Sequence, residues 1–139
     1  MTSASVTETV AAPAADVWRV MSNFAGVEPN EMIAGCTTTG EGVGAVRTIT
    51  LTAGGEIVER LESLDDATMS FSYAIINDSP LPVADYLSTV RISDDGQGGT
   101  SVTWSSTFEA RGAPEADVIK LIEGVYKGGI ARARGKLGL

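Results

Sequence analysis

The sequence predicts an α+β fold in which seven antiparallel strands curve around one long C-terminal helix. Short strand-like segments, separated by turns rich in Gly and Asp, follow one another from residue 32 to residue 109. The last part of the chain instead repeats its apolar residues at helical spacing. Its 139 residues are enough for one domain and too few for two ordinary ones. One sheet packed against one amphipathic helix buries the apolar faces of both.

The N-terminal elements are a strand and two short helices. Val6–Val10 alternates apolar and polar residues and is predicted to be the first strand. Pro13 suits the first turn of a helix. Gly26 and Pro29 interrupt this helix and leave a short second turn or helix at Val27–Asn30. The apolar residues that recur at helical spacing in the first helix are Val17, Val20, Met21 and Phe24.

Six further strands are expected to follow one another as an antiparallel meander. The turns "AGG" at 53–55 and "DD" at 65–66 are short enough for hairpins. The turn "DDGQGG" precedes the last strand. The predicted strands are Met32–Thr39, Ala45–Thr52, Glu56–Leu64, Met69–Ile76, Tyr86–Ser93 and Thr100–Glu109.

The C-terminal helix is expected to begin at Pro114 and to continue to about Lys136. Acidic residues follow the proline, where they favour the positive end of the helix dipole. Gly124, Gly128 and Gly129 lie inside this helix, where a glycine costs about 1 kcal/mol relative to alanine. Close approach to a ligand or to the sheet, or a bend, would explain them; simple tolerance of the cost is the alternative.

Composition excludes several classes of function. The net charge of −8 disfavours nucleic acid and anionic membranes as partners. With Cys36 as the only cysteine and no histidine, we expect no disulfide, no metal site and no Ser-His-Asp machinery, and we predict no cofactor. The N-terminus lacks the pattern of a signal peptide, and no apolar run is long enough to insert into a membrane. A cytoplasmic location is therefore expected.

Several polar residues occupy strand positions that are normally apolar in a packed interior. Arg47, Glu59, Tyr73 and Tyr86 each share strand parity, and so a sheet face, with apolar neighbours two residues away. A face that mixes aliphatic and aromatic residues with charged ones is typical of a wet, ligand-sized cavity. The sequence thus predicts a chamber between sheet and helix.

The element order, with "APAADVWRVMSNF" opening the first helix, resembles the START and birch-pollen-allergen superfamily (SRPBCC, polyketide cyclase/dehydrase-like). The middle third is similar to plant abscisic-acid receptors and their bacterial relatives. The matching pieces are "VR" at 46–47, "ERL" at 59–61, "LDD" at 64–66, "II" at 75–76 and "Y-x-S-x-V" at 86–90. The resemblance implies a helix-grip fold around an internal cavity.

The same resemblance implies which side chains reach the cavity. It places Arg47, Glu59, Tyr86 and Ser88 in the pocket, with a gate loop at 52–56 and a latch loop at 77–85. Two positions depart from the receptors: Ala34 replaces a ligand-gripping lysine, and Ser105 replaces a buried glutamate. Abscisic acid itself is therefore not the expected ligand. Alternation alone would instead turn Trp104 inward, and the sequence leaves this choice open.

Arg47 and Glu59 allow two interpretations. They are either an internal ion pair that offsets its own desolvation, or an anchor for an anionic oxygen beside a general acid or base. Tyr126 on the long helix points either into the cavity or to its rim. The complete set of predicted ligand contacts is Ala34, Arg47, Leu51, Glu59, Tyr73, Ile75, Tyr86, Ser88, Ser105 and Tyr126, of which Arg47, Glu59 and Tyr86 are the catalytic candidates.

Three functions remain open for this single domain, residues 1–139. The first is binding of a small hydrophobic molecule, aromatic or isoprenoid-like, oriented by the polar residues. The second is a cofactor-free cyclase, dehydratase or lyase that uses Glu59 as acid or base. The third is an interaction module in which the basic C-terminal helix meets an acidic partner. The ligand, the reaction and the oligomeric state are not predictable from the sequence.

Overall fold

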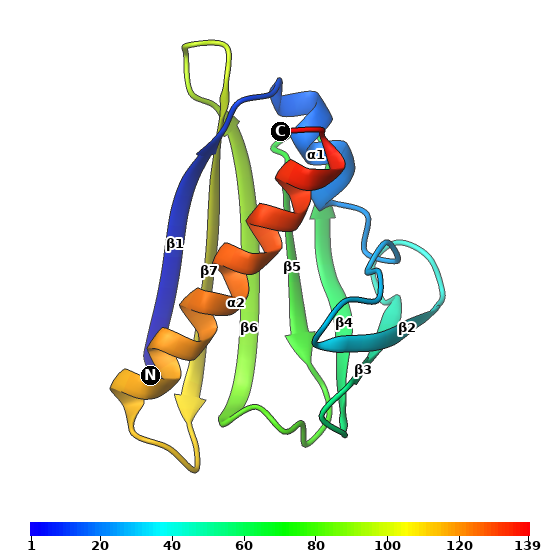
Figure 1. Cartoon of the computed structure of the whole chain (residues 1–139), viewed down its shortest axis with the longest axis vertical. Helices are drawn as coiled ribbons and strands as arrows, with labels where there is room; N and C mark the ends of the chain where they lie inside the picture. Colours follow the sequence, from blue (N-terminus) through cyan, green and yellow to red (C-terminus); the bar gives the residue numbers. More distant parts are fainter.

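A computed structural model describes all 139 residues, and one long helix crosses the face of a seven-stranded sheet in it (Figure 1). All strand pairs are antiparallel, in the order β1-β7-β6-β5-β4-β3-β2. This confirms the predicted sheet and C-terminal helix. The strands are β1 (Thr2–Val10), β2 (Ile33–Thr39), β3 (Val46–Leu51), β4 (Glu56–Asp65), β5 (Ser70–Ile75), β6 (Val83–Asp94) and β7 (Thr100–Ala110); the helices are α1 (Ala14–Met21) and α2 (Glu115–Lys136).

The prediction of two short N-terminal helices was wrong, because only α1 forms. Residues 27–30 have no regular structure. Pro29 lacks a backbone donor and disfavours a helical conformation of the residue before it. The Asn30 side chain accepts hydrogen bonds from the backbone N–H groups of Met32 (2.8 Å) and Ile33 (2.9 Å). This local bonding favours a turn that leads directly into β2.

Two segments cover the concave face of the sheet. Helix α2 lies diagonally over β1 and β7, with its C-terminal end beside α1 (Figure 1). Its buried residues recur every three or four positions: Val118, Ile122, Tyr126, Ile130 and Ala133. Helix α1 is fixed at the β4–β5 turn, because the Trp18 indole N–H donates to Asp66 Oδ1 at 2.9 Å.

One glycine of α2 has a clear packing reason. A Cβ atom at Gly129 would lie 2.5 Å from the Trp104 ring, so the helix and β7 touch there without a side chain between them. At Gly124 nothing lies within 4 Å of such a Cβ atom, and at Gly128 only the Arg132 side chain does, at 3.6 Å. Close approach therefore explains Gly129, and simple tolerance explains the other two.

The strand register sets which side chains share the concave face. Arg47 pairs with Glu59, and Glu59 pairs with Ile75, in one row across β3, β4 and β5. The next row runs from β4 to β1 and consists of Leu61, Tyr73, Ser88, Ser106 and Ala4. Both rows face the helices, and they bring the polar residues of the middle strands together.

Candidate functional site

A buried ion pair joins β3 and β4 on the concave face, toward the β2 edge of the sheet. Arg47 Nε donates to Glu59 Oε1 at 2.7 Å, and Arg47 Nη2 lies 2.7 Å from the same oxygen. Only 12% of the arginine and 9% of the glutamate side chain is exposed. The second carboxylate oxygen, Oε2, accepts no hydrogen bond from the protein. Glu59 thus has one carboxylate oxygen that receives both contacts from Arg47 and a second oxygen that is free.

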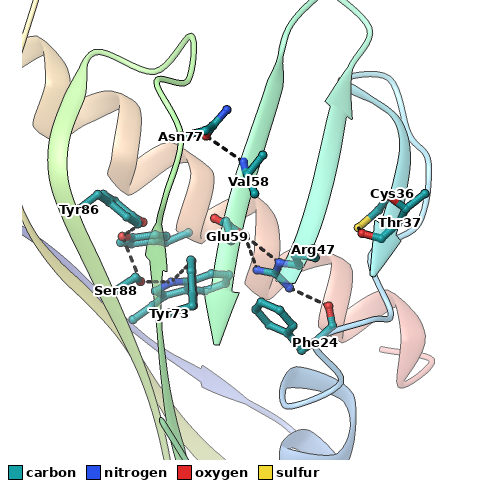
Figure 2. A network of polar contacts seen from close by, with 12 residues as sticks. Phe24, Cys36, Thr37, Arg47, Val58, Glu59, Tyr73, Asn77, Tyr86 and Ser88 are labelled. Carbon is teal, nitrogen blue, oxygen red and sulfur yellow. Dashed lines mark hydrogen bonds and ion pairs between the residues drawn. The ribbon is translucent and has the colours of Figure 1, made fainter. Parts of the chain in front are cut away.

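Aromatic rings and a carbonyl hold the guanidinium in place. The Arg47 Cζ atom lies 4.1 Å from the centre of the Phe24 ring and 5.1 Å from that of Tyr73. Arg47 Nη1 donates to the Phe24 carbonyl oxygen at 3.0 Å. Figure 2 shows Arg47 between Glu59 and Phe24. The segment after α1 therefore seals the ion pair from one side.

The position of Glu59 raises the pKa of its carboxyl. Burial disfavours the charged form, and the charge and hydrogen bond of Arg47 offset only part of that effect. Because its pKa is raised, the Glu59 carboxyl takes up a proton more readily than an ordinary glutamate, and its free oxygen is available for proton transfer.

The tyrosines form a second polar cluster with Ser88 and Trp104. The Tyr86 and Tyr126 hydroxyls hydrogen-bond to each other, and Ser88 Oγ donates to the Tyr126 hydroxyl at 3.3 Å. The Trp104 indole N–H donates to Ser88 Oγ at 2.9 Å and to the Tyr73 hydroxyl at 3.2 Å. The Trp104 ring also stacks on Tyr126, with centroids 4.8 Å apart. The sequence predicted the tyrosines and Ser88 as ligand contacts, which stays a prediction, and it left the inward role of Trp104 open.

Burial raises the pKa of all three tyrosines. Desolvation is the largest cause for Tyr73, Tyr86 and Tyr126. Each hydroxyl therefore keeps its proton at neutral pH and can donate a hydrogen bond to a ligand oxygen. None of the three is suited to act as a base.

The variant Tyr126→Phe tests the cohesion of this cluster. It removes the hydroxyl that bonds to Tyr86 and Ser88 while keeping the ring that stacks on Trp104. Ser88 keeps the Ser105 carbonyl as an acceptor, at 3.2 Å. We expect the free energy of unfolding to fall by about 1–3 kcal/mol, because the buried Tyr86 hydroxyl is left without a partner. Urea unfolding followed by circular dichroism measures this. Thr7→Val, which removes the exposed hydroxyl bond to Thr103, is the control; an equal loss in both variants would contradict the prediction.

The other predicted contacts lie in different places. Ile75 and Leu51 are half-buried on the concave face, in register with Glu59 and Ile33 respectively. Ala34 is exposed beside the register shift of β2. The inward prediction for Ser105 was wrong: β1 and β7 pair without a bulge, so Trp104 and Ser106 face inward and Ser105 faces outward. Simple alternation gave the right answer here, and the resemblance did not.

Ser106 was missed by sequence reasoning. It is 5% exposed and pairs with Ser88 in the register of β6 and β7. Its hydroxyl is the one buried side-chain oxygen that makes no hydrogen bond of standard geometry, although it lies close enough to the Tyr126 hydroxyl to offset part of the rise in the pKa of that group. A native structure rarely leaves such a group unsatisfied, so it marks a place where a ligand or water oxygen can bind. Its parity with Trp104 and Phe108 was the available signal.

The predicted chamber is not open in this structure. The polar side chains expected to line it bond to and pack against one another, and Tyr73, Tyr86, Ser88 and Tyr126 are at most 5% exposed. One opening in the surface, of about 220 Å³, lies between the segment after α1 and the β2–β3 turn. Another, of about 420 Å³, lies by the β6–β7 turn and the C-terminus. None of the predicted contacts lines either one.

The two loops predicted to form the mouth lie against each other. A Cβ atom at Gly55 would lie 2.8 Å from the Pro80 ring. Asn77 joins the second loop to β4: its Oδ1 accepts from the Val58 N–H at 3.0 Å (Figure 2), and its Nδ2 donates to the Glu56 carbonyl at 3.0 Å. Strand β6 already begins at Val83, so the second loop is shorter than predicted. This end of the molecule is closed.

The basic end of α2 is partly used inside the fold. Arg134 donates to Glu8 Oε1 at 2.9 Å and to the Thr9 carbonyl at 2.6 Å, and Lys136 donates to the Gly26 carbonyl at 2.9 Å. These bonds attach α2 to β1 and to the segment after α1. They give the basic residues a structural role and leave fewer cations for an acidic partner.

No three His, Cys, Asp or Glu residues lie close enough together to hold a metal ion. No helix is long and apolar enough to cross a membrane. Burial raises the pKa of the Cys36 thiol, which makes it a weak nucleophile.

Comparison with known proteins assigns the family. Residues 1–138 match the model of the family described as polyketide cyclase / dehydrase and lipid transport. The chain belongs to this family. Its membership confirms the START/SRPBCC superfamily assignment and gives the fold a general association with hydrophobic ligands.

Solved structures agree with the polyketide cyclase/dehydrase family assignment. The protein XoxI from Bacillus cereus is 28% identical, with a TM-score of 0.84, over 98% of this chain and 95% of that one. A Bacillus thuringiensis protein is 27% identical, with a TM-score of 0.82, over 96% of each chain. A Thermobifida fusca protein is 25% identical, with a TM-score of 0.73, over 96% of this chain and 91% of that one. No curated protein matches this family member.

Proposed function

We propose that this protein binds a small, largely apolar molecule, aromatic or isoprenoid-like, on the concave face of its sheet. The observation that carries the proposal is the presence of two polar atoms without a protein partner on one concave face: the free Oε2 of Glu59 on β4 and the buried Ser106 hydroxyl on β7. A buried hydroxyl is normally bonded, so Ser106 leaves a place for a ligand atom, and the free Oε2 can accept a further hydrogen bond. Apolar walls would supply most of the affinity and the polar atoms the orientation.

Residues of the second cluster are suited to hold a ligand oxygen. Tyr86 and Tyr126 stay protonated and lie in hydrogen-bond contact with each other and near Ser88. An incoming carbonyl or hydroxyl group would exchange bonds with them at little net cost, because protein–ligand bonds replace protein–protein bonds. Loops 52–56 and 77–82 would remain closed over one end of the ligand.

A second candidate function is cofactor-free proton transfer, as in a cyclisation, dehydration or elimination. The raised pKa and the free Oε2 of Glu59 favour it, because a general acid or base needs both a matched pKa and an accessible oxygen. Arg47 would then stabilise a developing enolate or phenolate oxygen. Tyr86 would serve as a hydrogen-bond donor.

The variant Glu59→Gln separates binding from catalysis. Molecules that co-purify with the native protein are identified by native mass spectrometry, and their affinity and turnover are measured for both forms. Under the binding function, we expect affinity to change by no more than about tenfold and no turnover by either form. Turnover by the native protein that is lost in the variant establishes the enzyme.

Glu62→Gln is the matched control, because Glu62 forms the exposed ion pair with Arg60 on the other face of β4. It should change neither affinity nor turnover. Failure of the native protein to retain any co-purifying molecule, together with failure to bind any member of an aromatic and isoprenoid library, would refute the proposed function.

A further inference from the structure

The end of the molecule beside Phe24 differs from the end closed by the two loops. There, an opening of about 220 Å³ leads inward between residues 22–25 and the β2–β3 turn. Its apolar walls are Phe24, Ala25, Ala45, Leu61 and Leu64. A cavity of about 150 Å³ already accommodates benzene, so this opening has room for one substituted ring.

Phe24 stands between this opening and the ion pair. Its ring is 7% exposed, lines the opening and covers the Arg47 guanidinium, whose Cζ lies 4.1 Å from the ring centre. Its carbonyl oxygen accepts the Arg47 Nη1 hydrogen bond at 3.0 Å. The Tyr73 ring also lies near the guanidinium, with its centre 5.1 Å from Arg47 Cζ and its plane tilted by 55° from that of Phe24. One residue therefore supplies both a planar ring and an oxygen acceptor to Arg47, as an aromatic ketone or aldehyde would.

The charges around the opening favour a neutral ligand. The charge of Arg47 is already balanced by Glu59, and Glu41 at the rim places a negative charge beside the entrance. The whole chain carries a net charge of −8. An anion would be repelled on approach and would find no uncompensated cation inside.

We infer that the ligand enters through the opening beside Phe24, and that the Phe24 ring and carbonyl occupy the positions of a neutral, planar aromatic ligand that carries a carbonyl group. This inference rests on the proposed function and adds the ligand class and the entrance. The bound ring stacks on Arg47 in place of Phe24, and its oxygen accepts from Nη1. The segment 22–26, which has no regular secondary structure beyond turns, moves aside.

Acetophenone titrations of native protein and of Phe24→Ala, followed by 15N–1H NMR spectra that include the arginine Nε signals, test this inference. We expect acetophenone to bind Phe24→Ala at least about tenfold more tightly than native protein, because the variant leaves the ring position vacant. The Arg47 Nε signal and the backbone signals of residues 22–25 and 40–45 should shift. Ethylbenzene, which lacks the oxygen, should bind the variant more weakly than acetophenone.

Phe108→Ala is the matched control, since it removes a buried ring that stacks on Tyr86 far from Arg47 in the sheet register. Any acetophenone that binds in the space left by Phe108 should leave the Arg47 Nε signal unshifted. If Phe24→Ala fails to fold, Phe24→Leu removes the planar ring with a smaller loss of packing and should give a smaller gain in the same direction. A gain in Phe108→Ala equal to that in Phe24→Ala would overturn the inference.

The outcomes separate the inference from the function on which it rests. If aromatic ligands bind with equal affinity to native protein and Phe24→Ala, or shift only signals of loops 52–56 and 77–82, the entrance assigned here is wrong and the binding function stands. If neither native protein nor any variant binds a member of the library, the proposed function and this inference both fail.

Discussion

Replacing Arg47 with methionine is expected to lower the free energy of unfolding by about 3–5 kcal/mol, because the variant leaves a buried carboxylate without its partner. Only 9% of the Glu59 side chain is exposed, so water cannot take over the lost interaction. The variant also lacks the contacts that the guanidinium makes with the ring and the backbone carbonyl of Phe24. Chemical unfolding in urea at neutral pH measures the loss.

The pH dependence of this loss identifies its cause. The pKa of Glu59 is raised in the folded state, so folding favours its protonated form, and this contribution to stability is lost as pH rises above the ordinary glutamate pKa of 4.5. Arg47 limits that rise, so the pKa of Glu59 rises further when Arg47 is removed. The difference in stability between native protein and Arg47→Met should therefore shrink as pH falls from about 7 to about 4.

Two further variants control the experiment. Arg60→Met breaks the exposed pair with Glu62, whose side chains are 47% and 34% exposed, and should cost no more than about 1 kcal/mol. The double variant Arg47→Met with Glu59→Leu should recover much of the stability, since an apolar pair can replace a buried ion pair. A loss in Arg47→Met that is independent of pH and is not recovered would contradict the assigned cause.

Gly129→Ala is expected to destabilise the fold by about 1–3 kcal/mol although alanine is the better helix former. The added methyl group would meet the Trp104 ring at 2.5 Å and 2.7 Å. That ring cannot easily move, because it stacks on Tyr126 and donates to Ser88. Thermal and urea unfolding measure the effect.

Gly124→Ala, on the same helix, is expected to change the stability in the opposite direction. Nothing lies within 4 Å of the added methyl group, so helix propensity alone acts and should stabilise by about 0.5–1 kcal/mol. Equal effects of the two substitutions would show that α2 does not rest on Trp104 through Gly129.

The sheet and its polar face could be predicted from the sequence because parity is a local property. Arg47 and Glu59 occupy equivalent positions in adjacent strands, and the register indeed places them opposite each other. The long helix could be predicted equally well, since its apolar residues repeat over many turns. The second N-terminal helix was not, because the Asn30 side chain competes for backbone donors within a few residues.

The alternation of residues in the strands could not show whether the predicted chamber is open. Alternation shows that Tyr73 and Tyr86 share a face, and it does not show whether their hydroxyls meet a ligand or other side chains. The decisive contacts join residues far apart in the sequence, such as Tyr86 with Tyr126 and Trp104 with Ser88. The position of the Phe24 ring over Arg47 could not be predicted either, because Phe24 lies in an irregular segment without a repeating pattern of apolar residues.

The bonds of the Trp104 indole restrict how protons can point along the tyrosine cluster. An indole N–H can only donate, so Ser88 Oγ accepts from it and gives its own proton either to the Ser105 carbonyl oxygen at 3.2 Å or to the Tyr126 hydroxyl at 3.3 Å. When it donates to Tyr126, Tyr126 donates to Tyr86 in turn. The Tyr86 proton is then left for an acceptor outside this chain of hydroxyls. A carbonyl compound reaching Tyr86 would find a donor already aligned and would require no rearrangement of the protons behind it.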